Sequence, residues 1–193
     1  VNPSRGLGDV YKRQEESYYL ISAGAWTEYD SDYLHKSLAD SKFDNVSIYD
    51  CTSQWGVFSI AGPKSRNFLK KLVVSEDPDK TLSNKQFPWL SYRDIEIGMC
   101  PVRALRVAYT GELGWELHHP IEMQNYLLDI LLSSGKEFNL KLVGARAQNW
   151  LRQEKSYKAF GSDLGRDAGP FESKLSRFVD INKNFLGKDA LLK

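Results

Sequence analysis

Hydrophobic positions along this chain follow two spacings, one of two residues and one of three to four, which predicts both strands and helices. Apolar and β-branched runs predict strands over Ser17–Ala23, Trp55–Ala61, Val102–Tyr109, Trp115–His118 and Phe178–Ile181. Spacings of three and four predict helices over Asp30–Ala39, Lys64–Leu72, Gln124–Leu132 and Gly144–Tyr157, the last with Trp150 on its inner side. Residues 75–80 are expected to form an acidic loop, and Gly187 is expected to open a short final helix. This mixture indicates the α+β class, with helices on one face of antiparallel sheets.

Two of the predicted strands flank a turn over Thr110–Gly114 that carries two glycines, which is typical of a hairpin. Alternation along paired strands would aim Tyr109 and Glu116 at one side of the sheet. The Glu116 carboxylate could then accept two parallel N–H bonds from the edge of an aminopyrimidinone ring such as pterin. The competing interpretation is a plain hairpin whose glutamate is solvated.

Composition narrows the class of protein. The 193 residues are 41% hydrophobic and 26% charged, as in ordinary soluble domains. A net charge of +1 argues against a nucleic-acid partner, and no apolar run is long enough to span a bilayer. No secretory signal pattern is visible, so we expect a cytoplasmic protein, or a mitochondrial matrix protein in a eukaryote.

The potential metal ligands are sparse. Cys51 and Cys100 are far apart in the sequence and are expected to be reduced, packed thiols. His118 and His119 are neighbours in a predicted strand and should point to opposite faces, so no metal site is predicted.

Residues 1–14 differ from the rest, because they are polar and basic and lack any strand or helix period. We interpret them as a non-native or disordered segment and expect residues 15–193 to form the folded domain. Since the sequence begins in this segment and ends inside a predicted helix, we expect that domain to be truncated at both ends.

Five stretches occur in unbroken order between residues 16 and 193: Ser22–Trp26, Thr52–Arg66, Arg106–Leu117, Arg152–Leu164 and Phe185–Lys188. Together they resemble the aminomethyltransferase (glycine-cleavage T-protein) family, and within it the folate domain of sarcosine and dimethylglycine dehydrogenases. The resemblance implies a folate-binding core of two antiparallel-sheet and helix subdomains packed around a central cleft. It also implies that the family's C-terminal β-barrel is missing from this sequence.

The resemblance assigns residues to a folate site. Glu116 would hold the pterin and Tyr109 would line the same pocket. Arg146 would pair with the folate tail, although Ala147 stands where the family usually has Asp; an exposed helix charge is the alternative. Phe160 replaces the branch's usual Trp and keeps an aromatic wall.

The family's catalytic aspartate follows the Ser22–Trp26 turn, where two acids compete. Asp30 fits best if one inserted residue is allowed, and Asp32 is the other candidate. The simpler alternative is that Asp30 only caps the following helix. We expect Asp30, Glu116 and Arg146 to line one shared cavity.

The implied function is one-carbon transfer to tetrahydrofolate. The one-carbon unit of an N-methyl amine, dimethylglycine or sarcosine, would be oxidised in a missing N-terminal FAD domain and captured here as 5,10-methylenetetrahydrofolate. One alternative is a stand-alone aminomethyltransferase or folate-dependent demethylase. Another is a non-catalytic folate-binding protein of the iron–sulfur maintenance type, although its K-G-C-Y-x-G-Q-E stretch is absent. A third is a fragment that folds poorly and binds nothing.

Overall fold

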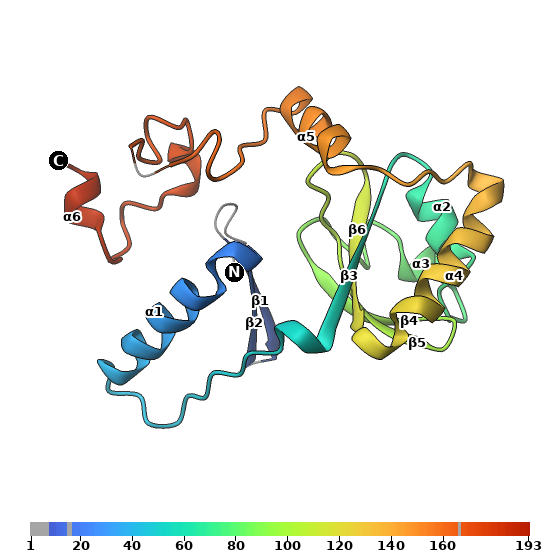
Figure 1. Cartoon of the computed structure of the whole chain (residues 1–193), viewed down its shortest axis with the longest axis horizontal. Coiled ribbons are helices and arrows are strands. Elements are labelled where there is room, and N and C mark those ends of the chain that lie inside the picture. Colours follow the sequence, from blue (N-terminus) through green and yellow to red (C-terminus); the bar gives the residue numbers. More distant parts are fainter. Residues whose placement is uncertain (1–7, 15–16, 166) are drawn as a thin grey trace. The chain divides into compact units, whose positions relative to one another are not determined.

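The chain divides into two compact units in the computed structural model, which describes residues 8–14, 17–165 and 167–193 (Figure 1). The central unit is Asn45–Tyr157. The terminal unit combines Val1–Asp44 with Lys158–Lys193. The two units are described separately below.

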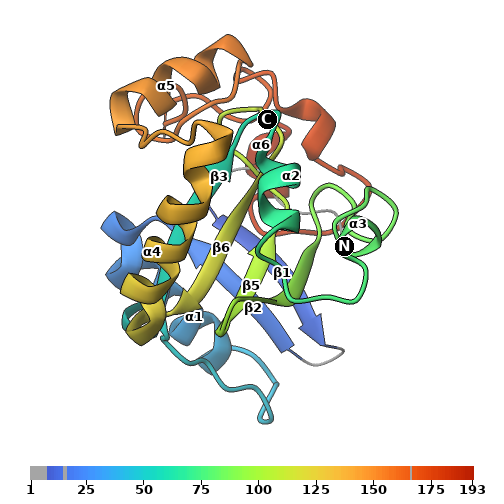
Figure 2. The same cartoon turned by 90° about the vertical axis from the view of Figure 1, so that its right-hand side faces the viewer.

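The central unit is built on a four-stranded antiparallel sheet with the order β3-β6-β5-β4. Its strands are β3 (Trp55–Ala61), β4 (Tyr92–Ile97), β5 (Cys100–Leu105) and β6 (Gly114–Pro120). Its helices are α2 (Ser65–Lys70), α3 (Pro78–Thr81), α4 (Gln124–Gly135) and α5 (Ala145–Glu154). Short 3-10 turns cover Thr52–Gln54, Ile121–Met123 and Lys136–Phe138. Helices α2 and α4 lie on the same side of the sheet (Figure 2).

The hydrophobic core fills the space between the sheet and these two helices. Trp115 and Leu117 of β6 pack with Leu69 of α2 and Leu127 of α4, and all four are fully buried. Each such side chain contributes about 1.5–3 kcal/mol through removal from water. Because side chains alternate along a strand, the residues between those core positions lie on the opposite face of the sheet.

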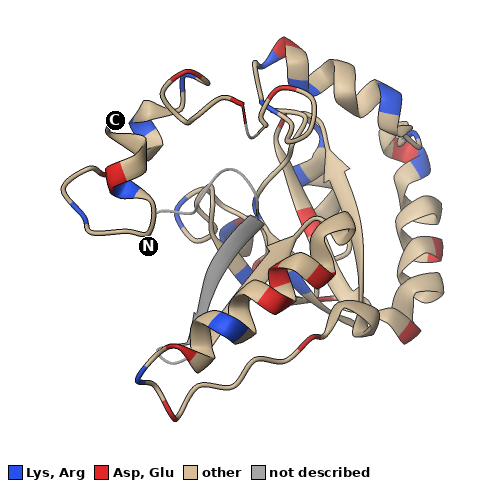
Figure 3. Cartoon of the chain, turned by 60° about the vertical axis from the view of Figure 1, so that its left-hand side comes forward, with Lys and Arg blue, Asp and Glu red and all other residues tan. Residues whose placement is uncertain are grey.

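The terminal unit holds a two-stranded antiparallel ribbon, β1 (Gly8–Gln14) with β2 (Ser17–Ser22). A 3-10 turn over Gly24–Trp26 leads into α1 (Thr27–Ala39), which buries none of its residues. Figure 3 shows charges of both signs along α1. Loops, a 3-10 turn over Ser176–Phe178 and α6 (Lys188–Leu191) complete the unit.

The α+β class with an antiparallel sheet is confirmed, and β3 has the predicted bounds. The strand predicted over Val102–Tyr109 ends at Leu105, because the Val107 amide turns back to the Leu105 carbonyl at 2.9 Å and this tight turn takes the chain out of the sheet. The strand predicted over Phe178–Ile181 is wrong, since it begins in a 3-10 turn and does not join a sheet. The predicted acidic loop, residues 75–80, overlaps α3, where the Asp77 carboxylate at the N-cap accepts a hydrogen bond from the Lys80 amide at 2.9 Å.

Residues 1–14 were expected to lack regular structure, yet residues 8–14 form β1; residues 1–7 lie outside the described part of the chain. The non-native origin of this segment stays a prediction. So do the central cleft between subdomains and the missing barrel. None of the helices in the described ranges combines the length and apolarity needed to cross a bilayer.

Candidate functional site

Glu116 lies in the middle of β6, an inner strand of the sheet, and pairs with Ser59 of β3 and Leu105 of β5. Its side chain stands on the face opposite the core, between Trp115 and Leu117, which are both fully buried. The side chain is 27% exposed, and its Oε2 lies 3.4 Å from Nε2 of His118. The carboxylate is therefore held from one side and open on another.

Further charged residues share this face. Arg103 of β5 is directly opposite His118 in the register and is only 5% exposed. Its Nε lies 3.4 Å from Asp94 Oδ1, and its guanidinium stands 4.8 Å from the Trp55 ring centroid. We call the face that carries Ser59, Asp94, Arg103, Glu116 and His118 the polar sheet face. Arg103 and His118 are almost completely buried, and the fully buried Leu105 lies directly opposite Glu116, so the polar groups of this face that a ligand could reach are Glu116, Asp94 and Ser59.

The segment between β5 and β6 folds back over the start of β6. The Gly111 amide bonds to the Ala108 carbonyl at 3.1 Å, and Gly111 has a φ of 72°, in the left-handed region. A Cβ on Gly114 would lie 2.8 Å from the Ala108 Cβ, so glycine permits this close approach. Tyr109 comes directly after Ala108, which lies against Gly114, and Gly114 is two residues before Glu116 in β6. The Tyr109 ring is 36% exposed.

Helix α5 fixes that loop through one buried arginine. Arg152 is 3% exposed and donates from Nη1 to the Tyr157 carbonyl at 2.7 Å and from Nε to Asn149 Oδ1 at 2.8 Å. Its guanidinium lies 6.0 Å from the Tyr109 ring, and the Tyr109 and Tyr157 rings are 6.4 Å apart. Arg152 was not predicted as a site residue, although the Arg152–Leu164 stretch that carries the family resemblance begins with it.

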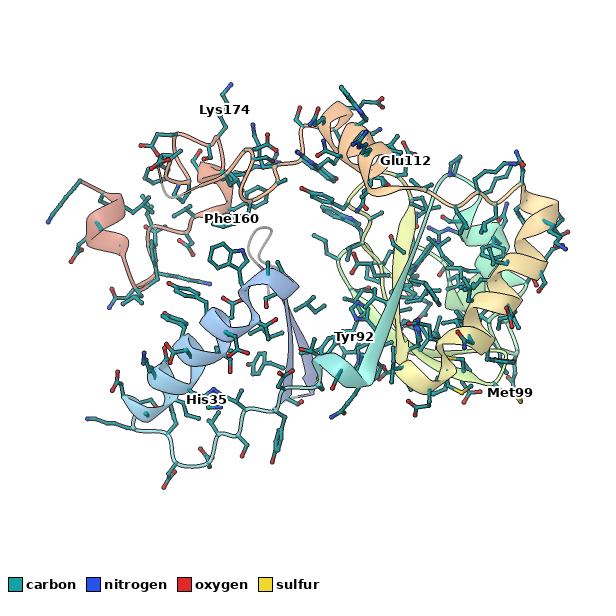
Figure 4. All side chains as sticks on the ribbon, in the orientation of Figure 1. His35, Tyr92, Met99, Glu112, Phe160 and Lys174 are labelled. Carbon is teal, nitrogen blue, oxygen red and sulfur yellow. The ribbon has the colours of Figure 1, made fainter. Side chains whose placement is uncertain are left out.

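A second contact ties α5 to the same loop. Lys155 Nζ lies 3.6 Å from Glu112 Oε1, and Lys155 carbons cover Gly111. Figure 4 labels Glu112 beside α5. The segment 106–113, which we call the Tyr109 loop, is thus held by the end of α5 and the start of β6.

Arg146 occupies the first turn of α5 and is exposed. Its side chain makes no hydrogen bond or ion pair with the described part of the chain, so no contact brings it to Glu116. Trp150 was expected on the inner side of this helix, but it is 68% exposed and the buried residue is Arg152.

Asp30 and Phe160 belong to the terminal unit. The Phe160 ring meets the Trp26 ring edge-on at 5.8 Å, beside the first turn of α1 (Figure 4). Asp30 is four residues after Trp26 and thus on the same side of the helix. The helix begins at Thr27 with Trp26 at its N-cap, so the alternative that Asp30 is the cap is wrong. Asp32 is bound to Lys36 at 2.7 Å, whereas Asp30 has no ion pair among the described residues.

The two neighbouring histidines lie on opposite faces of β6, as alternation predicts. His119 is fully buried, donates from Nδ1 to the Leu117 carbonyl at 2.9 Å and stacks on Phe58 at 4.8 Å. Among residues 8–14, 17–165 and 167–193, no group of three or more His, Cys, Asp or Glu side chains is placed to hold a metal ion.

A model of the GCVT N-terminal domain matches residues 8–183. The chain belongs to this family. The expected aminomethyltransferase family is thereby confirmed, and its motifs span both units.

Relatives of two kinds resemble this GCVT chain. Human mitochondrial dimethylglycine dehydrogenase is 36% identical over 92% of the chain, and an aminomethyltransferase from Caldanaerobacter subterraneus subsp. tengcongensis is 34% identical over 95%. The chain spans about a fifth of the dehydrogenase and 47% of the aminomethyltransferase. A heterotetrameric sarcosine oxidase from Corynebacterium sp. U-96 shares the fold, with a TM-score of 0.54 and 18% sequence identity. The match covers 71% of this chain and 64% of the matched sarcosine oxidase chain.

Proposed function

We propose that this GCVT domain binds tetrahydrofolate and transfers a one-carbon unit to it, forming 5,10-methylenetetrahydrofolate. The observation that carries the proposal is the partly exposed Glu116 carboxylate, set on a rigid inner strand beside the anchored Tyr109 loop. Membership of the GCVT family and the aminomethyltransferases among its relatives support it.

The residues of the central unit fit a flat, hydrogen-bonding ring. A carboxylate presents two acceptor oxygens to a pair of parallel N–H donors on a ring edge. The exposed part of the Tyr109 ring offers an apolar surface for stacking, and the buried Arg152 keeps that ring in place. Arg146, exposed and without an ion pair among the described residues, is available to the carboxylates of the folate tail.

Asp30 is the residue we propose for the chemical step. A carboxylate beside the reacting nitrogen orients the ligand and stabilises cationic iminium character in the carbon being transferred. Trp26 and Phe160 form an aromatic contact one helical turn away and would shield the carbon from water. Holding the two reactants together also removes the entropic cost of their encounter.

The proposed source of the carbon is an N-methyl amine, dimethylglycine or sarcosine, oxidised by an FAD domain in a longer protein. The names of the dehydrogenase relatives support this source, since each is 32–36% identical over 92% of this chain. These relatives are about five times longer than the matched region, which leaves room for such a domain.

A stand-alone aminomethyltransferase is the second candidate. The Caldanaerobacter relative favours it, because this chain covers 47% of that shorter protein at 34% identity. Sequence flanking the chain in its gene distinguishes the two candidates, since only the first predicts an FAD-binding domain in the same protein.

The test of folate binding is calorimetry with tetrahydrofolate. Glu116→Ala is expected to weaken binding by about 1.5–3 kcal/mol, the range for a hydrogen bond to a charged group. Glu122→Ala is the matched control, because Glu122 is exposed in the 3-10 turn after β6 and should leave affinity unchanged. Equal affinity of the wild type and Glu116→Ala would count against this pocket.

A further inference from the structure

We propose that His118 is a positioning residue that orients the Glu116 carboxylate for its ligand. This inference rests on the proposed function of Glu116. His118 does not itself touch the ligand in this proposal; it acts by fixing the side chain that does.

The geometry of β6 places His118 where it can do this. Residues 116 and 118 are two apart on one strand, so their side chains lie on the same face. The His118 ring is 2% exposed, and its Nε2 lies 3.4 Å from Glu116 Oε2. An imidazole with a proton on Nε2 donates it to that oxygen. Each carboxylate oxygen accepts more than one hydrogen bond, so Glu116 keeps acceptor capacity for a ligand.

His118 is itself held by its neighbours across the sheet. Val57 of β3 and Arg103 of β5 are its register partners. Arg103 is fixed in turn by Asp94 on one side and by the Trp55 ring on the other. The buried imidazole therefore lies between cross-strand neighbours, and few other rotamers are accessible to it.

This arrangement has a consequence for binding. A free glutamate side chain samples many rotamers, and a ligand must select one of them at an entropic cost. A carboxylate already fixed by a buried donor avoids part of that cost, so its ligand binds more tightly. His119 offers a contrast, since its ring is stacked in the core and its Nδ1 is bound to a backbone carbonyl.

The experiment is a double-mutant cycle read by tetrahydrofolate calorimetry on the full chain. The variants are Glu116→Ala, His118→Leu and the two combined. We expect His118→Leu to weaken binding by about three- to tenfold, as the loss of one hydrogen bond does. In the Glu116→Ala background the same change should have no further effect, because residues that act through one another are not additive.

Two amide variants separate positioning from packing. His118→Gln keeps a donor that can reach Glu116 and should retain near-wild-type affinity, whereas the shorter His118→Asn should bind as weakly as His118→Leu. The Gln and Asn pair replaces the leucine variant if that protein does not fold. Unfolding midpoints are measured alongside, because a purely structural role would lower stability in every variant without this pattern in affinity.

The outcomes separate the two proposals. If Glu116→Ala binds as tightly as the wild type, the proposed function fails and this inference fails with it. If Glu116→Ala weakens binding but folded His118→Leu does not, or weakens it equally in both backgrounds, only the role of His118 is overturned. Equal affinities of the Gln and Asn variants would overturn it as well.

Discussion

The two acids of α1 differ in what their carboxylates contact, and this difference predicts different mutants. Asp32 is exposed and bound to Lys36 one turn away, a kind of pair worth about 0.3–0.5 kcal/mol. Asp30 is partly buried and one turn from Trp26. Asp30→Ala should leave tetrahydrofolate affinity unchanged but slow transfer by about 10²–10³-fold, the cost of losing one electrostatic stabiliser.

The measurement is 5,10-methylenetetrahydrofolate formation from dimethylglycine or sarcosine at saturating tetrahydrofolate, with the flavin domain supplied. Asp32→Ala is the control and should react at nearly the wild-type rate. If Asp32→Ala alone slows transfer, the catalytic aspartate is Asp32 and the residue inserted after Trp26 has been misplaced.

The two cysteines should differ sharply in reactivity. Burial raises the pKa of the Cys100 thiol, and the nearby Glu122 carboxylate raises this pKa further. A raised pKa means less thiolate at any given pH, and the thiolate is the reactive form. At pH 8, iodoacetamide should modify the partly exposed Cys51 first and Cys100 only in denaturant. Mass spectrometry of the peptides checks this, and labelling of native Cys100 at the rate of Cys51 would contradict it.

At the level of elements, local pattern predicted strands better than it predicted their ends. The β3 strand was found from its own residues, since an apolar run between polar segments specifies a strand locally. The end of β5 was misplaced because Leu105 to Tyr109 keep alternating, while a tight turn after Leu105 takes the chain out of the sheet. The Val107 amide bonds back to the Leu105 carbonyl at 2.9 Å, and Arg106 Nη1 bonds to the Phe87 carbonyl at 2.5 Å. The contact with Phe87 joins residues far apart in the sequence and is not visible in a local window.

Helix α5 illustrates a second limit of sequence reasoning. Its helical period was predicted, but Trp150 was assigned to the inner side because large aromatics are usually buried. The structure buries Arg152 instead, satisfied by Asn149 and the Tyr157 carbonyl. A period defines a helix face, but which face meets the protein depends on tertiary partners. The buried polar residues Arg152, His118 and Arg103 were therefore the part of the candidate site that sequence missed.

The Tyr109 loop gives a prediction at this scale. Gly111 has a positive φ, and a Cβ there would overlap the side chain of Lys155. Gly111→Ala should destabilise the protein by about 1–3 kcal/mol, the cost of a strained left-handed residue. Gly165→Ala is the control, because its Cβ would enter open space. Urea unfolding followed by circular dichroism measures both, and equal midpoints would show that the loop tolerates a side chain here.

At the level of the whole molecule, the family match and the core are distributed differently. The GCVT domain extends over residues 8–183 and so takes in both units, whereas the buried hydrophobic residues of the described chain all fall between Ile60 and Leu131. Sequence motifs could reveal the family because they are collinear. They could not reveal whether Asp30 of the terminal unit meets Glu116 and Arg146 of the central unit, and that shared cavity stays a prediction.

The uneven core predicts uneven protection from hydrogen exchange. Amides of β5 and β6 lie between buried side chains and should exchange only by global opening of the central unit. Helix α1 has 13 residues and buries none, and a helix of that length is marginal without packing, so its amides should exchange much faster. Mass spectrometry of the full chain checks this order, and α1 protection equal to that of β6 would contradict it.

Added tetrahydrofolate should slow exchange in residues 106–116, because a ligand held by Glu116 and Tyr109 must stabilise the loop that joins them.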